Sequence, residues 1–149
     1  MSEIVTVEGT CRWAKVFELN RDPGGTHNGN VFPEATTIEV VLDQDELLKL
    51  TKVDTDIKPS VDSDGMFIKL RRRWLNPNPT RGGAPKVVDA KGEVMDGSVL
   101  IGDGSKVKVA IEVYKTKHGT ARRLAGVQVL ELNEYVPEGG EEEELELPF

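Results

Sequence analysis

The chain has 149 residues, one cysteine, two histidines and a net charge of −7. This length predicts one domain that buries a core without disulfides, and one thiol with two imidazoles is too small a set for a structural zinc site. The sequence shows no apolar run of membrane-spanning length and no secretory signal, so we expect a cytoplasmic protein without membrane contact, metal or cofactor.

The negative charge is concentrated at one end. Residues 138–149 hold six of the 26 acidic residues and no base, so residues 1–137 carry 20 acids and 19 bases and are close to neutral. We therefore expect one folded domain over 1–137, followed by a disordered acidic C-terminal tail over 138–149.

Short segments of alternating apolar and polar residues, separated by Gly, Pro, Asn and Asp, predict an all-β domain. Residues 20–34 and 75–85 are expected to be loops, and 116–120 a hairpin loop. Asp43, followed by acids and three leucines, predicts one short helix over 43–52. The expected strands are 10–19, 35–43, 65–74, 86–90, 106–115 and 121–135.

This succession of strands fits an OB-fold, which is a five-stranded Greek-key barrel, here with one short helix. A β-sandwich is the alternative, because the pattern of strands alone does not separate the two architectures.

Successive strand residues point to opposite faces of a sheet, so each expected strand can be divided. Two strands have a clear core face, made by Met66, Ile68 and Leu70 in one and by Val107, Val109, Ile111 and Val113 in the other. The opposite faces carry aromatic and basic residues, namely Phe67, Lys69, Arg71 and Arg73, and Lys108 and Tyr114.

The strand 10–19 places Trp13, Lys15 and Phe17 on one face, but which face points inward stays open. An aromatic ring beside bases suits single-stranded nucleic acid, because bases stack on rings and phosphates need cations. The alternatives are that Trp13 and Phe17 belong to the core and that the arginines form a solvated edge. Recurrence of the pattern on three strands favours binding.

Catalytic motifs are missing from the sequence. It contains no nucleophile elbow and no Walker loop, and neither histidine is placed as an obvious base. Residues 102–105, "GDGS", read as a turn, because no Lys-Ser/Thr pair follows the glycines as a phosphate loop requires. We therefore expect a protein that is not an enzyme.

Several segments together resemble the single-stranded DNA-binding proteins of short-tailed, double-stranded DNA phages. These segments are "RWAKVF", "GMFIKLRRRW", "PKVVDAKGEVMDGSVLIGDGSKVKVAIEVY" and "GTARRLAGVQVLELNEY", followed by an acidic tail with a phenylalanine at its end. The resemblance implies an OB-fold that coats single-stranded DNA without sequence specificity during phage DNA replication, recombination and repair. It implies that DNA lies in the barrel groove, on Trp13, Lys15, Phe17, Phe67, Lys69, Arg71, Arg73, Lys108 and Tyr114.

The resemblance also assigns the tail to partners, the replicative DNA polymerase and the helicase-primase. Its partner-binding residues would be Glu141, Glu142, Glu143, Glu144, Glu146, Leu147, Pro148 and Phe149. Independently of the resemblance, the charge of the tail predicts that its carboxylates compete with DNA for the cationic groove. The tail is shorter than in the longest members, so the oligomeric state stays open, with a homodimer as one form. The alternative functions are a protein-interaction module and an RNA-binding OB domain.

Overall fold

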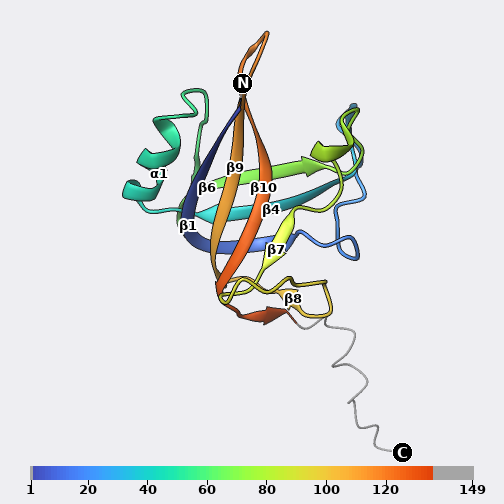
Figure 1. Cartoon of the computed structure of the whole chain (residues 1–149). Helices are drawn as coiled ribbons and strands as arrows, with labels where there is room; N and C mark the ends of the chain where they lie inside the picture. Colours follow the sequence, from blue (N-terminus) through green and yellow to red (C-terminus); the bar gives the residue numbers. More distant parts are fainter. Residues whose placement is uncertain (1, 136–149) are drawn as a thin grey trace, which may run out of the picture.

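The computed structural model describes residues 2–135, and the acidic tail with its expected partner-binding residues lies outside them. The strands and helices are laid out along the chain in Figure 1. In chain order they are β1 (Ser2–Lys15), β2 (Gly25–His27), β3 (Asn30–Phe32), β4 (Ala35–Val41), α1 (Gln44–Thr51), β5 (Ser60–Asp62), β6 (Gly65–Arg73), η1 (Pro79–Arg81), β7 (Lys86–Val88), β8 (Leu100–Ile101), β9 (Lys106–Thr116), β10 (Gly119–Glu131) and β11 (Glu134–Tyr135).

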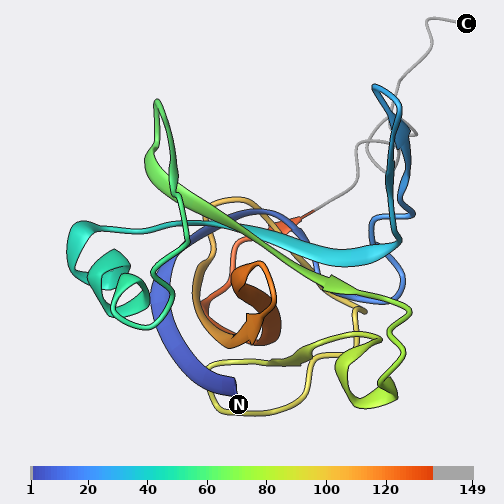
Figure 2. The same cartoon turned by 90° about the horizontal axis from the view of Figure 1, so that it is seen from above.

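The main sheet has the strand order β5-β6-β4-β1-β9-β10-β7 and curves into a barrel (Figure 2). The long strand β1 pairs antiparallel with β9 over its first part and with β4 over its last part. The seam between β6 and β10 is bridged by Arg72, whose Nη1 donates to the Leu124 carbonyl oxygen at 3.3 Å. The circuit β1-β4-β6-β10-β9 is that of an OB-fold, which confirms the predicted fold class and excludes the sandwich.

The barrel interior is filled by the inward side chains of these strands. The predicted core face of β9 is confirmed, since Val107, Val109, Ile111 and Val113 are all buried. In β6 Ile68 and Leu70 are buried, as the alternation predicts, whereas Met66 is only partly buried. The side chains of both strands that point outward are therefore available for function.

The predicted short helix is confirmed as α1. Asp43 caps it, because its Oδ1 accepts from the Glu46 N–H at 2.9 Å, and Leu50 anchors it in the core. Within residues 2–135 no helix is long and apolar enough to cross a membrane.

The structure contains more strands than the sequence predicts, including β5 and β8. Strand β1 begins at Ser2 instead of residue 10, because residues 2–10 pair in register with 106–114 of β9. Residues 20–34, expected to be a loop, contain the β2–β3 hairpin, which turns at Asn28 and Gly29 with φ of 52° and 80°. Asn-Gly is a strong signal for such a turn, and the surrounding glycines and prolines obscured it in the sequence.

Candidate nucleic-acid interface

One outer face of the barrel gathers most of the predicted site residues. Strand β6 presents Lys69, Arg71 and Arg73 outward, in register with Glu39, Thr37 and Ala35 of β4. The end of β1 adds Trp13 and Lys15, since Lys15 pairs with Thr37. Figure 2 shows the β2–β3 and β5–β6 hairpins at opposite ends of the β4–β6 pair, projecting to the same side. We call Trp13, Lys15, Lys69, Arg71 and Arg73 the basic face.

Trp13 is exposed because the backbone turns at this residue. Its φ is 53°, in the left-handed region, and the pairing of β1 with β4 shifts register between Arg12 and Lys15. The side chains of Trp13 and Lys15 consequently point outward while that of Ala14 is buried. The indole is 63% exposed, which is unusual for so large a ring and leaves it free to stack on a ligand.

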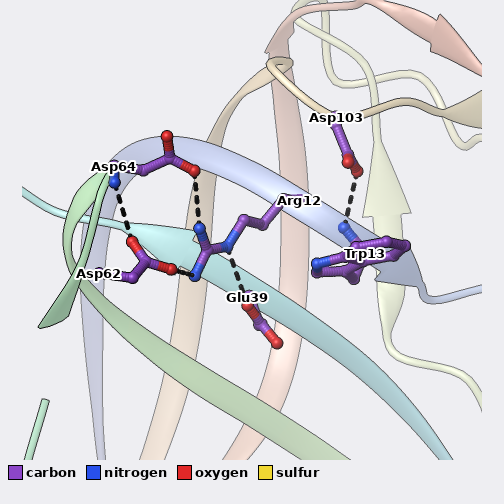
Figure 3. Close-up of polar contacts among 6 residues, drawn as sticks. All are labelled: Arg12, Trp13, Glu39, Asp62, Asp64 and Asp103. Carbon is purple, nitrogen blue, oxygen red and sulfur yellow. Dashed lines mark hydrogen bonds and ion pairs between the residues drawn. The ribbon is translucent and has the colours of Figure 1, made fainter. Parts of the chain in front are cut away.

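The loop over 102–105 holds this turn in place. The Cys11 N–H donates to the Ser105 carbonyl oxygen and the Gly104 N–H to that of Cys11, each at 2.9 Å. The Trp13 N–H donates to Asp103 Oδ1 at 2.8 Å (Figure 3). The "GDGS" segment is therefore a structural turn, as predicted, and it also fixes the backbone beneath the exposed indole.

Trp13 and Lys15 stand between two hollows. The smaller, of about 210 Å³, is lined also by Lys69, Asp22, Thr37, Ile38 and Glu39. The larger, of about 400 Å³, is lined also by Ala14, Asn20, Leu100, Ile101 and Asp103. We call them the Lys69 hollow and the Leu100 hollow. The structure thus brings Trp13, Lys15 and Lys69 together, as the sequence predicts.

Phe17 does not share this face. It is 5% exposed and belongs to the core, which corrects the prediction that it lies beside Trp13 and Lys15. The alternation fails because β1 ends at Lys15 and the chain turns, with the Phe17 N–H donating to Asn20 Oδ1 at 3.1 Å. The sequence left open that Trp13 and Phe17 belong to the core, and for Phe17 this alternative is correct.

Phe67 lies on the outward side of β6, but a side chain of the protein covers it. The Arg12 guanidinium carbon lies 4.2 Å from the ring centroid, in cation–π geometry. Arg12 is itself held by Glu39 at 2.9 Å, Asp62 at 2.5 Å and Asp64 at 2.8 Å (Figure 3). One face of the Phe67 ring is therefore occupied by a guanidinium whose side chain is only 13% exposed.

The same cluster changes the charge at this end of the sheet. The hydrogen bond between Arg12 and Asp62 raises the pKa of the Arg12 guanidinium and lowers the pKa of the Asp62 carboxyl. One cation thus faces three carboxylates, so the cluster is acidic overall. Anionic groups are therefore repelled by this cluster and attracted to Lys15, Lys69, Arg71 and Arg73.

The two arginines of the basic face differ in their surroundings. Arg71 is half-buried, with Nη2 at 4.0 Å from Asp22 Oδ2. Arg73 is exposed at the end of β6. Trp74, which follows β6, is half-buried, with the Arg21 guanidinium carbon 4.4 Å from its ring centroid.

Lys108 and Tyr114 lie elsewhere. Lys108 borders a third hollow, of about 390 Å³, together with residues of β1, β7 and β10, including Lys86 and Gln128. The Tyr114 ring carries the Arg123 guanidinium at 4.4 Å, and Arg123 is paired with Glu112 at 2.8 Å. The structure does not bring these two residues to the basic face, which corrects their assignment to the same groove.

Sequence reasoning missed several residues around the site. Asp103, Leu100 and Asn20 line the Leu100 hollow but show no motif, since Asp103 is 90 residues from the Trp13 that it contacts. Arg12 is not among the residues that the sequence predicts for the site. Arg72, which lies between two predicted site residues, faces inward and also donates to the Thr80 and Gly82 carbonyl oxygens at 3.0 and 3.1 Å.

No protein-family model matches the chain, and no curated protein sequence matches it significantly. Among solved structures, gp2.5, a single-stranded DNA-binding protein encoded by bacteriophage T7, aligns with 21% identity and a TM-score of 0.55, covering 100% of this chain and 98% of that one.

The single-stranded DNA-binding protein of bacteriophage Enc34 also aligns. In complex with single-stranded DNA it gives 14% identity and a TM-score of 0.54 over 88% of each chain. Its C-terminal truncation gives 16% identity and a TM-score of 0.54 over 88% of this chain and 87% of that one. This chain therefore shares its fold with single-stranded DNA-binding proteins of phages.

Proposed function

We propose that this protein binds single-stranded DNA through the basic face, without catalysing a reaction. The observation that carries the proposal is the exposed Trp13 between Lys15 and Lys69, with a hollow on each side. A base stacks on such a ring at about 1–3 kcal/mol, and lysines and arginines neutralise the phosphates that flank it. The outer face of the second and third barrel strands is where OB-folds hold oligonucleotides, and here those strands are β4 and β6.

The fold neighbours support the proposal, since both are single-stranded DNA-binding proteins and one was solved with its ligand. The proposed interface consists of Trp13, Lys15, Lys69, Arg71 and Arg73. Phe67 contributes less, because Arg12 covers its ring and three carboxylates surround that arginine.

Titration of labelled oligo-dT, followed by anisotropy across a salt series, tests the proposal. We expect micromolar or tighter binding at low salt, with affinity falling steeply as salt rises because bound phosphates release counterions. Absence of binding at low salt, by the full chain and by a chain that ends at residue 137, would contradict it. Parallel oligo-U titrations separate DNA from RNA binding, since the 2′-hydroxyl distinguishes the two.

Tryptophan fluorescence locates the contact. Stacking of a base on Trp13 should quench its emission, whereas Trp74 is shielded by Arg21. The Trp74→Phe variant should therefore keep the DNA-induced quenching and the Trp13→Phe variant should lose it. The opposite pattern would place the bases away from the basic face.

We further propose that the protein coats single strands during phage DNA replication, recombination and repair, in the cytoplasm of the host cell. In this proposal residues 138–149 compete with DNA for the basic face and recruit the replicative polymerase and the helicase-primase. Competition with DNA is supported by the charge distribution, since residues 138–149 hold six acids and no base whereas residues 1–137 are close to neutral.

Deletion of 138–149 tests the competition. We expect tighter DNA binding, most strongly at low salt, because the carboxylates no longer occupy the cationic face. Phe149→Ala should weaken capture of partner proteins and leave DNA affinity nearly unchanged, whereas Glu→Gln changes at 141–144 should raise DNA affinity. Equal affinities for the full and truncated chains would remove competition and leave recruitment to be tested by pull-down of the polymerase.

A further inference from the structure

The Leu100 hollow has the size and lining of a site for one small planar group. Its volume of about 400 Å³ is within the range of roughly 300–1,000 Å³ that is usual for small-molecule sites. Leu100, Ile101 and Ala14 supply apolar walls, and the exposed Trp13 indole borders the opening. A nucleobase that stacks on Trp13 would have its edge directed at the polar groups of the hollow.

Those polar groups are few, and two of them do not select among bases. Asn20 is engaged by the protein, because its Oδ1 accepts from the Phe17 N–H and its Nδ2 donates to the Ala14 carbonyl oxygen. Lys15 lines both hollows, and its ammonium can donate to the carbonyl of cytosine or of thymine alike. Discrimination at this site therefore depends on Asp103.

Asp103 offers acceptors and no donor. Among the described residues its carboxylate receives one hydrogen bond, from the Trp13 N–H to Oδ1, while an ionised carboxylate has about four lone-pair sites. The Asp103 backbone is fixed by the Asn133 side chain, whose Nδ2 donates to its carbonyl oxygen at 2.6 Å. The carboxylate is thus held at the edge of the hollow with acceptor capacity to spare.

We propose that the Leu100 hollow takes one nucleobase of the bound strand and that Asp103 selects bases that carry an exocyclic amino group. The proposal rests on single-stranded DNA being the ligand. Cytosine presents an N4 amino donor, which carboxylates accept, whereas thymine and uracil present a carbonyl oxygen at that position, which a carboxylate repels. The protein would then bind without a strict sequence but with a preference for cytosine over thymine.

Oligo-dC and oligo-dU of equal length are the probes, because their bases have the same ring size and lack the thymine methyl group. We expect the wild-type chain to bind oligo-dC roughly fivefold or more tightly than oligo-dU, the ratio expected from one specific base contact. In Asp103→Asn the amide oxygen still accepts from the Trp13 N–H, while the charge is lost and an NH₂ donor appears. The ratio should fall to about one or reverse in this variant.

Asp22→Asn is the matched control. Asp22 lines the Lys69 hollow, so this change also removes one negative charge beside the basic face but does not alter the Leu100 hollow. It should raise the affinity for both oligonucleotides and leave their ratio as in the wild type.

Three other outcomes would overturn the inference, and each has a different meaning. Tight binding of both probes with a wild-type ratio near one rejects base selection and leaves DNA binding standing. A preference for oligo-dC that persists in Asp103→Asn places the selection elsewhere. Failure of the wild type to bind either probe rejects the proposed function and this inference with it. If Asp103→Asn does not fold, a wild-type ratio near one still rejects the inference.

Discussion

The surroundings of Trp13 and of Phe67 differ although the sequence predicted the same role for both. Trp13 is 63% exposed, borders two hollows and has Lys15 and Lys69 nearby. Phe67 is half-buried beneath Arg12, and that arginine is bound by three carboxylates. Within the described residues, the aromatic ring is thus open to a ligand at Trp13 and covered by a paired cation at Phe67.

The largest effect is expected for Phe17, the third aromatic assigned to the same face. Phe17→Ala should lower the free energy of unfolding by about 3–5 kcal/mol, because it empties a buried volume in the core. Urea unfolding measures this loss. A change within error would mean that Phe17 lies at the surface beside Trp13, which would undermine the contrast drawn between exposed and buried rings.

The next largest effect is on DNA binding. Trp13→Ala should cost about 1–3 kcal/mol, or roughly 5–150-fold in affinity, through loss of base stacking. Phe67→Ala should cost less than the lower end of that range, because Arg12 already covers its ring. Anisotropy titration of both variants at one salt concentration is the measurement, and equal losses would remove the distinction between the two sites.

The lysines near Trp13 should set part of the salt dependence. Lys15→Ala and Lys69→Ala should each flatten the slope of log affinity against log salt by about 0.7, the value for one phosphate contact with single-stranded nucleic acid. Lys108→Ala is the control, since Lys108 borders a different hollow. An equal flattening by Lys108→Ala would show that DNA follows a wider path than the basic face.

The smallest effect concerns the acidic cluster around Phe67 and its pH dependence. The pKa of Asp62 is lowered by its hydrogen bond with Arg12, so its stabilising contribution is present above the ordinary aspartate pKa and is lost as pH falls through the lowered one. Arg12→Met should destabilise the protein at neutral pH, because three carboxylates then face one another. The difference in urea midpoint from the wild type should shrink over roughly pH 5 to pH 2. A difference that is constant with pH would show that Arg12 acts by packing alone.

Much of the fold could be predicted because its signals are local. The alternation in 106–115, the cap at Asp43 and the outward side of 65–74 depend on neighbours in sequence, and the structure confirms all three. The candidate site depends on contacts between distant residues. Asp103 meets Trp13, and Asp62 and Asp64 meet Arg12, across loops whose course the sequence pattern does not specify.

The face of the strand around Trp13 could not be predicted for a related reason. Alternation holds while the backbone stays extended, and at Trp13 it does not. Nothing in "RWAKVF" indicates a left-handed residue, because glycine, asparagine or aspartate would be expected there. The 102–105 loop imposes this conformation through its hydrogen bonds with Cys11 and Trp13.

The left-handed backbone at Trp13 has a consequence for how this protein can evolve or be engineered. A residue with a Cβ at this position is about 1–2 kcal/mol less stable than in right-handed geometry, a cost that glycine avoids. Selection for heat resistance alone would therefore favour Trp13→Gly, and the resulting protein would have a relaxed backbone but no indole. With the role proposed for Trp13, stability and DNA affinity conflict at this one residue, so a tryptophan retained here by related chains would record selection for binding.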